Sequence, residues 1–480
     1  MRALILLHRW LGVAFCLLFA MWFASGIVMH FVPFPALTET DRFAGLPPID
    51  LASVRHSPVE ALGSSGIEDA ARIRLIERSD GPVYLVQEST RTAALHAADL
   101  SDAAVHSQRL ALAIATGYAA YRQWDATAAE IFGPTAYDQW TVPNGFDRYR
   151  PLYRVALNDG PGTELYVAST TGEVVLDTTH RERAWNYVGS IAHWIYPTAL
   201  RSHPAVWSRL LWWLSLLALI GASTGAAIGM LRFGGDGSRF SSPYRGWQAW
   251  HHWLGLCCMV FVLSWIFSGW LSMDSGNLFS TGKPTDAEAA SIAGTPPWNA
   301  LPRDEIQRLS APVREVEWFA LGDRIYRRER AGVDRQLLFV TGAADEAARP
   351  DRAFLRQDEI NAAVSRLARS CDASGLVGAD DDYGVASNTP GAPIFRAVCG
   401  ADWFDIDGSN GALLEKLDTS RRAYRWLALH TLDFPVLTTR PALRTSLIVI
   451  LCACGFVFSL TGVVIAWRRL LSCFRSPERQ

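Results

Sequence analysis

The chain contains four apolar stretches that are each long enough to cross a lipid bilayer. A membrane-spanning helix needs about 20 consecutive apolar residues, and inside a bilayer only helices and closed barrels satisfy every backbone hydrogen bond. The stretches cover residues 11–32, 210–231, 247–272 and 445–467. The sequence therefore predicts a membrane protein with four transmembrane α-helices. The first is too long for the apolar core of a signal peptide, so we expect it to be retained.

The first and third stretches share one sequence pattern. His-x-Trp-Leu-Gly begins at His8 and again at His251, and both copies continue into an apolar run that contains Ser-Gly. His8, Gly12 and Gly26 each recur 243 positions later, without insertion. On an α-helix, with about 100° per residue, these three residues form one stripe. Such a stripe favours either close packing against another helix or contact with a flat, bulky ligand.

The long segment between the first two stretches has the pattern of a mixed α and β domain. Two strand-like runs flank Asp80-Gly81, which is a hairpin signal. Thr171-Gly172-Glu173 marks a tight turn between two later strands. The expected strands are 73–77, 83–87, 150–157, 164–169 and 174–177, with a helix at 103–122.

The long segment before the fourth stretch repeats this order with more divergence. A helix is expected at 358–369, followed by strands at 392–398, 402–407 and 412–418. In each half, a short amphipathic helix with a histidine is expected at the outer interface before the next span. These histidines, His193 and His430, are 237 positions apart. Residues 282–297 are rich in Ala, Gly, Thr and Pro and indicate a flexible linker.

The repeat predicts that a whole half of the chain has been duplicated. The expected fold is a pseudo-twofold bundle of four transmembrane α-helices with two extracytoplasmic α+β domains. Arginines gather in the short loop between spans two and three and in the tail, which places both termini in the cytoplasm. The predicted boundaries are spans at 1–32, 206–231, 247–273 and 442–467, outer domains with their interfacial helices at 33–205 and 274–441, a cytoplasmic loop at 232–246 and a cytoplasmic tail at 468–480.

Several classes of function are disfavoured by composition. The formal net charge of −2 gives no reason to expect nucleic acid, and the near absence of charged residues in the spans argues against ion transport. No Cys-x-x-Cys is present. Cys371 and Cys399 both lie in the second outer segment, where an oxidising compartment permits a disulfide between them.

The repeated histidines are the candidate functional residues. In a pseudo-symmetric bundle the equivalent side chains face each other, and two facing imidazoles suit the axial positions of a b-type haem. We therefore expect two haems, one held by His8 and His251 near the inner membrane face and one held by His193 and His430 near the outer face. Interfacial histidines that only hydrogen-bond lipid or backbone are the alternative.

Other residues were also candidates for these sites. His30 lies on the stripe of His8, and its repeat partner is Met273, so this pair is a second choice for the outer haem. His252 is the backup inner ligand. Gly12 and Gly255 are expected to face the haem and to leave space for it.

With two copies of span, outer α+β domain and span, the chain resembles the PepSY-associated transmembrane family over nearly its whole length. The resemblance rests on the His-x-Trp-Leu-Gly motifs from His8 and His251, on Thr171-Gly172-Glu173 and on the histidines before spans two and four. Members are iron-regulated inner-membrane proteins of bacteria, and some are haem-containing reductases that release iron from ferric siderophores in the periplasm. The second turn here reads Ser409-Asn410-Gly411-Ala412, which departs from Thr-Gly-Glu.

The resemblance implies the same four histidines as haem ligands, with PepSY-like outer domains that dock the ferric complex. Electrons would come from a quinol or from a cytoplasmic partner. The first hypothesis is therefore a haem-dependent transmembrane ferric reductase. The alternative is a non-enzymatic PepSY membrane protein that binds or regulates a periplasmic partner such as a peptidase.

Overall fold

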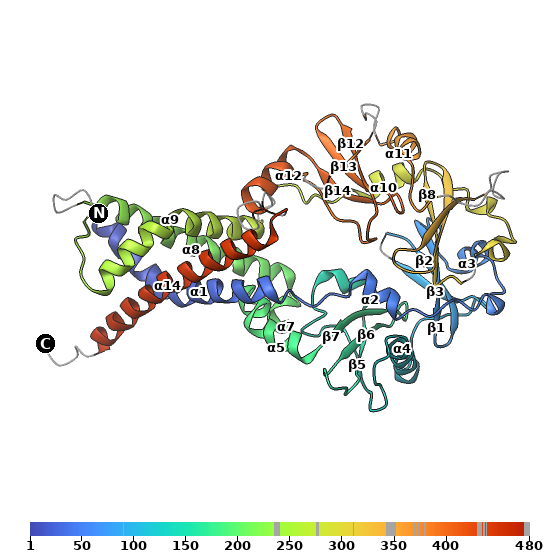
Figure 1. Cartoon of the computed structure of the whole chain (residues 1–480), viewed down its shortest axis with the longest axis horizontal. Helices are drawn as coiled ribbons and strands as arrows, with labels where there is room; N and C mark the ends of the chain where they lie inside the picture. Colours follow the sequence, from blue (N-terminus) through green and yellow to red (C-terminus); the bar gives the residue numbers. More distant parts are fainter. Residues whose placement is uncertain are drawn as a thin grey trace. The chain divides into compact units, whose positions relative to one another are not determined.

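The chain folds into two compact units, and each unit uses both halves of the sequence (Figure 1). The helical unit consists of Met1–Phe34, Glu182–Phe279 and Arg422–Gln480, and the sheet unit consists of Pro35–Arg181 and Ser280–Arg421. The structure is a computed structural model. It describes residues 1–474 except for 90, 235–240, 275–277, 311, 342–351, 368–370, 372–373, 379–380, 430–433, 435–436 and 438.

Four helices in the helical unit are long and apolar enough to cross a membrane, as predicted. They are α1 (Arg2–Phe31), α8 (Pro204–Arg232), α9 (Trp247–Ser272) and α14 (Pro441–Phe474). Three of the helices begin several residues before the predicted apolar stretches, because the polar flanks continue the helical hydrogen bonding. Figure 1 shows the start of α1, the end of α8, the start of α9 and the end of α14 at one end of the bundle.

The four helices pack so that α1 and α9 face each other diagonally. α1 packs against α8 and α14, and α9 packs against the same two neighbours. Small residues allow this close packing. A Cβ atom added at Gly455 on α14 would lie 2.6 Å from the ring of Phe23 on α1. The bundle core therefore brings side chains of α1 and α9 into one central space.

The segment before α8 is broken into three short helices, where one amphipathic helix was expected. α5 (His180–Val188), α6 (Ser190–His193) and α7 (Thr198–Arg201) follow one another. Gly189 separates the first two because its φ of −90° and ψ of −106° are not helical. Before α14, α12 (Thr419–Tyr424) is followed by a π-helix, η5 (Arg425–Leu429). His430 lies outside the described residues.

The sheet unit is organised around a six-stranded antiparallel sheet to which both halves of the chain contribute. Its strand order is β10-β9-β8-β1-β2-β3, and β1 pairs with β8 at its centre. The sequence predicted the β1–β2 hairpin but not this joint sheet. The strands are β1 (Arg72–Arg78), β2 (Gly81–Gln87), β3 (Thr92–His96), β8 (Glu315–Leu321), β9 (Arg324–Arg330) and β10 (Gln336–Val340).

Two four-stranded antiparallel sheets carry the other predicted strands, one from each half. The first has the order β4-β5-β6-β7 and the second β11-β12-β13-β14. A disulfide joins Cys371 to Cys399 at the end of β12. The strands are β4 (Glu130–Thr135), β5 (Leu152–Ala156), β6 (Glu164–Ala168), β7 (Val174–Thr178), β11 (Gly375–Leu376), β12 (Ile394–Cys399), β13 (Asp402–Asp407) and β14 (Leu413–Leu417).

The helices of the sheet unit correct two predictions. The helix expected from residue 103 is α4 (Gln108–Tyr121), which begins later because the side chain of Ser107 caps it by accepting a hydrogen bond from the Leu110 N–H. The expected linker 282–297 contains a helix, α10 (Asp286–Ala293), which begins at a capping box. The remaining helices are α2 (Glu39–Ala44), η1 (Leu51–Ser53), α3 (Pro58–Ser64), η2 (Asn144–Tyr149), η3 (Trp298–Ala300), η4 (Glu305–Arg308) and α11 (Gln357–Val364).

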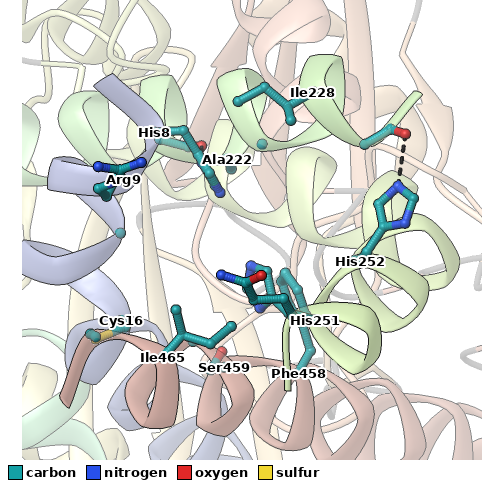
Figure 2. A pocket seen from close by; sticks show the side chains of 18 of the residues that line it. His8, Arg9, Cys16, Ala222, Ile228, His251, His252, Phe458, Ser459 and Ile465 are labelled. Carbon is teal, nitrogen blue, oxygen red and sulfur yellow. Dashed lines mark hydrogen bonds between the residues drawn. The ribbon is translucent and has the colours of Figure 1, made fainter. Parts of the chain in front are cut away.

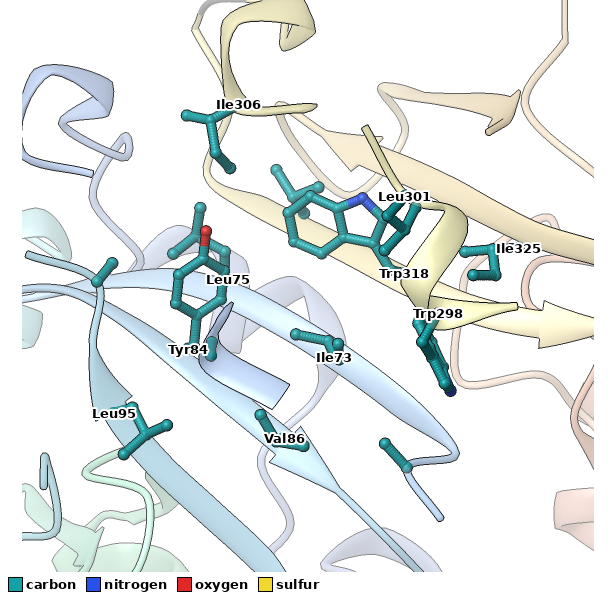
Figure 3. Packing of buried hydrophobic residues seen from close by; sticks show 14 of the residues in the cluster. Ile73, Leu75, Tyr84, Val86, Leu95, Trp298, Leu301, Ile306, Trp318 and Ile325 are labelled. Carbon is teal, nitrogen blue, oxygen red and sulfur yellow. The ribbon is translucent and has the colours of Figure 1, made fainter. Parts of the chain in front are cut away.

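One hydrophobic core crosses the β1–β8 junction (Figure 3). Figure 3 shows Tyr84 of β2 and Trp318 of β8 side by side, with their ring centroids 6.4 Å apart. Both side chains are fully buried. Burial of such large rings is a main source of stability, so the two halves of the sheet are expected to fold together.

A buried network of charges lies across the same junction. Glu315 of β8 is 2% exposed and accepts hydrogen bonds from Arg42, Arg74 and Arg330 at 2.6–3.2 Å. Arg330 also bonds to Glu39 at 2.6 Å. Buried charges are tolerated only when they are paired, so this network requires the α2 segment, β1, β8 and β9 to assemble in one register.

Acid is expected to destabilise the sheet unit through this network. Burial alone would raise the pKa of Glu39, but Arg42 and Arg330 outweigh burial and lower this pKa to about 2. Arginines also hold the pKa of Glu315 below its ordinary value, although burial opposes them. Because both folded-state pKa values are depressed, the stabilisation is complete above the unfolded value of 4.5 and is lost as the pH falls through the folded values. As the pH is lowered from 4.5, the melting temperature measured by circular dichroism should therefore decrease. A melting temperature that stays constant below pH 4.5 would refute this prediction.

Candidate functional site

A large cavity lies inside the four-helix bundle, at the end where α1 begins. Its volume is about 700 Å³, which is within the range of cofactor and ligand pockets. His8, His251 and His252 line it, together with Arg9 and Arg245, and no carboxylate is among its described lining residues. The cavity is therefore mainly apolar, with imidazoles and positive charge as its polar groups.

His8 of α1 and His251 of α9 face each other across the cavity (Figure 2). Their ring centroids are 6.3 Å apart, and the ring planes are inclined by 35°. The pattern of the sequence predicted that these histidines would meet, and the diagonal placement of α1 and α9 brings them together. Two imidazoles on opposite sides of a metal ion, each about 2 Å from it, have centroids about 6 Å apart. The spacing therefore fits one metal ion between the rings.

The ring of His8 is fixed by a backbone carbonyl. Its Nδ1 lies 3.0 Å from the Gly221 oxygen on α8. A carbonyl only accepts hydrogen bonds, so Nδ1 carries the proton and Nε2 keeps a lone pair. Among the described residues, Nε2 of His8 has no hydrogen-bond partner. It is therefore in the state that a metal ligand requires.

The ring of His251 reaches the same state through a threonine hydroxyl. The Thr461 Oγ1 atom donates its only proton to the Phe458 carbonyl at 2.6 Å and lies 2.9 Å from His251 Nδ1. The hydroxyl must accept at its second contact, so Nδ1 of His251 carries the proton and Nε2 keeps the lone pair. Phe458 also stacks on the imidazole, with ring centroids 4.8 Å apart. Neither Thr461 nor Phe458 was singled out from the sequence.

His252 differs from its neighbour because both of its ring nitrogens are engaged. Nε2 lies 2.9 Å from the Gly229 carbonyl, and Nδ1 lies 2.8 Å from the Ser242 hydroxyl. Figure 2 shows the His252 ring directed away from the space between His8 and His251. The geometry therefore favours His251 over His252 as a ligand.

Glycines shape the cavity in three different ways. A Cβ atom at Gly12 would meet nothing within 4 Å, so Gly12 borders open space. A Cβ at Gly255 would lie 3.2 Å from the Phe458 ring, and one at Gly225 would lie 2.5 Å from Cε1 of His8. Gly255 therefore packs against a side chain, and Gly225 provides the room that the His8 ring occupies. The role of Gly225 was not predicted.

His193 has a comparable arrangement on α6. Its Nδ1 lies 3.1 Å from the Trp22 carbonyl on α1, and so carries the proton, while no described residue is bonded to its Nε2. The Trp22 indole donates in return to the His193 carbonyl at 2.9 Å. Burial lowers the pKa of His193 to about 4, which keeps the ring neutral at physiological pH. The predicted partner, His430, is not among the described residues.

The second-choice pair consists of His30, in the last turn of α1, and Met273, which caps the end of α9. His30 Nε2 lies 2.9 Å from the Thr445 hydroxyl. Met273 ends α9, and its carbonyl accepts a hydrogen bond from Ser208 at 3.4 Å.

The described residues contain no group of three or more His, Cys, Asp or Glu that could hold a bare metal ion. In proteins generally, two facing imidazoles are a common ligand pair for a metal whose other four ligands belong to a macrocycle. The chain was also compared with known proteins. The family model described as the PepSY-associated TM region matches residues 5–469. No curated protein matches the chain.

Proposed function

Because the chain belongs to the PepSY-associated TM region family, we propose that it is a haem-containing electron-transfer protein that reduces a periplasmic ferric siderophore or a similar metal complex. The observation that carries this proposal is the pair His8 and His251, with facing rings and an Nε2 atom on each that has no partner among the described residues. These two imidazoles would hold the iron of one haem b.

The residues around the cavity would hold and orient this haem. The Gly221 carbonyl and Thr461 fix the two imidazoles through their Nδ1 atoms, and such contacts raise the basicity of a ligand. Arg9 and Arg245 line the same cavity and supply positive charge for the carboxylates of the porphyrin. When bound, haem supplies a reversible one-electron iron couple.

A second haem near the other end of the bundle is part of the proposal. His193, on α6, has a neutral ring whose Nε2 has no partner among the described residues, and His430 is its repeat-related counterpart. With one haem held near each membrane face, the chain would pass electrons from a quinol or a cytoplasmic donor across the bilayer.

We also propose that the fold arose by internal duplication. β1 and β2 lie 243 positions before β8 and β9, the same separation as His8 and His251. The β1–β8 register is symmetric, because Arg72 pairs with Phe319 and Ile76 pairs with Glu315. Moving each residue of the first pair by 243 positions into the other half turns Arg72 into Glu315 and Phe319 into Ile76, which is the second pair. This register supports a pseudo-twofold axis between β1 and β8.

The proposed location is the bacterial inner membrane, with both termini in the cytoplasm and the sheet unit in the periplasm. Arg9, Arg245 and Arg468 line the cavity at the bundle end that carries the start of α1 and the end of α14, and positive charge marks the cytoplasmic side. The Cys371–Cys399 disulfide in the sheet unit supports an oxidising compartment for that unit.

The reaction transfers one electron to Fe(III) in the siderophore complex and produces Fe(II). Fe(II) carries less charge and is a softer ion for hard oxygen ligands, so the siderophore holds it more weakly and the iron can exchange.

The function can be tested with full-length protein in detergent, reduced with dithionite, desalted without oxygen and mixed with a ferric siderophore. We expect the oxidised haem spectrum to return as one Fe(II) forms per haem oxidised. Haem-loaded protein that stays reduced in the presence of ferric siderophores would contradict the substrate assignment.

Replacing Gly225 with valine is expected to remove the inner haem. The first added atom would lie 2.5 Å from Cε1 of His8, so the ring must move away from its present position opposite His251. We expect at least about tenfold weaker haem binding at this site. Gly269→Val is the matched control, since a Cβ at Gly269 meets nothing within 4 Å. Equal haem content in the two variants, measured by absorbance, would disprove the role of Gly225.

A further inference from the structure

The sheet unit contains a second cavity beside the Thr171-Gly172-Glu173 turn. Its volume is about 320 Å³, and it is lined by the ends of β1 and β7, by the α2 segment and by α4. Gly172 has a φ of +68°, and a Cβ there would lie 2.3 Å from the Arg78 guanidinium. Glycine is therefore required at the turn, and it places Glu173 at the cavity wall.

Glu173 has one carboxylate oxygen that lacks a partner. Its side chain is 8% exposed, and Oε1 accepts a hydrogen bond from Arg74 at 2.8 Å. Oε2 is buried and accepts no hydrogen bond from any described residue. Buried charged oxygens are almost always hydrogen-bonded. A ligand with a hydrogen-bond donor would therefore satisfy this atom.

The arginines of the cavity are already neutralised by other carboxylates. Arg42 is paired with Glu39 and with Glu315, and Arg78 is paired with Asp80. These cations therefore contribute little net positive charge to the cavity, and an anionic ligand finds no free partner in them.

Unlike Glu173, two other carboxylates in the lining lack a basic partner among the described residues. Glu77 accepts a hydrogen bond from the Asp50 backbone N–H at 3.0 Å, and no described lysine or arginine is paired with Glu77 or Asp50. Burial raises the pKa of Glu77, and the charges of Asp50 and Asp80 raise it further, against the effect of the backbone hydrogen bond. The described lining contains three carboxylates, those of Asp50, Glu77 and Glu173, and two cations, which favours a cationic ligand.

We propose that this cavity binds a small organic dication, with one primary ammonium group at Glu173, a second at Glu77 and a short alkyl chain between them against the apolar wall. An ammonium group has three donors, which suits the unpartnered oxygen of Glu173 at one end of the ligand and the Glu77 carboxylate at the other. Leu46, Pro47 and Ile76 provide the apolar wall. A bare metal ion is disfavoured because the described residues offer no cluster of three or more ligands.

The corresponding turn in the second half lacks these features. Its sequence is Ser409-Asn410-Gly411-Ala412, so alanine stands where Glu173 stands in the first half. A Cβ added at Gly411 would lie 3.0 Å from the side chain of Leu321, whereas a Cβ at Gly172 would meet the side chain of Arg78. The proposed site therefore exists in one half of the molecule only, and it does not depend on haem in the bundle.

The test is isothermal titration of the full-length protein in neutral detergent with 1,5-diaminopentane. We expect saturable binding with a Kd of about 1 mM or tighter, and no binding of 1,5-pentanediol or of glutarate. Glu173→Gln removes the charge but keeps the shape, and we expect it to weaken binding at least about tenfold. Glu77→Gln is the second variant and should weaken binding as well.

Glu164→Gln is the matched control. Glu164 is 13% exposed and paired with Arg154 in the same sheet, but it does not line the cavity. Diamine binding should be unchanged in this variant. No diamine binding by the wild-type protein, or equal affinity in the wild-type, Glu173→Gln and Glu77→Gln proteins, would overturn the proposal.

Discussion

Replacing His251 with alanine is expected to abolish haem binding at the inner site while the chain remains folded. The substitution removes one of the two facing imidazoles, and the cavity offers no other histidine whose Nε2 is without a described partner at that position. Loss of an axial ligand leaves the iron with His8 alone. We expect the protein to lose one haem, as measured by absorbance and by haem extraction.

His252→Ala is the control for this prediction, because it changes the next residue of the same helix. Both nitrogens of His252 bond to other parts of the bundle, at Gly229 and Ser242. Its removal is expected to lower stability slightly and to leave both haems in place. Loss of a haem in His252→Ala with retention in His251→Ala would reverse the ligand assignment.

Replacing Glu315 with glutamine is expected to destabilise the sheet unit by about 3–5 kcal/mol, the usual cost of removing one partner of a buried ion pair. Glu315 is 2% exposed and is the only described carboxylate that contacts Arg42, Arg74 and Arg330 together. Without its charge the three guanidinium groups repel one another in a buried space. The free energy of unfolding from denaturant titration measures this effect.

Asp304→Asn is the control for the buried network. Asp304 is 60% exposed and pairs with Arg308 at 3.1 Å, and exposed ion pairs contribute about 1 kcal/mol or less. A Glu315→Gln protein as stable as Asp304→Asn would show that the network does not hold β1 against β8.

The membrane helices were predictable because their signal is local. Length and hydropathy alone locate α1, α8, α9 and α14, and turn signals such as Asp80-Gly81 locate the β1–β2 hairpin. The joint six-stranded sheet was not predictable in this way. Its central pairing joins Arg72 to Phe319, and no local pattern specifies a partner so far away in the sequence.

The two facing histidines of the candidate site were predictable, but the residues that hold their rings in place were not. The repeat pointed to His8 and His251, since duplicated side chains face each other in a symmetric bundle. The repeat placed His251 before His252, but the hydrogen bonds to Thr461 and Gly229 that separate the two lie on other helices and were not predictable. The unpartnered Oε2 of Glu173 was not predictable for the same reason, because Arg74, which binds only the other oxygen, lies far away in the sequence on β1.

The most direct measurement of the central claim is the absorbance spectrum of the purified full-length protein, oxidised and then reduced with dithionite, after expression with haem available. We predict a red protein with a reducible b-type Soret band, and a double His8→Ala, His251→Ala variant that contains one haem fewer. A colourless wild-type protein, or an unchanged haem content in the double variant, would contradict the account. A colourless protein would also favour the non-enzymatic alternative, in which the chain binds a periplasmic partner.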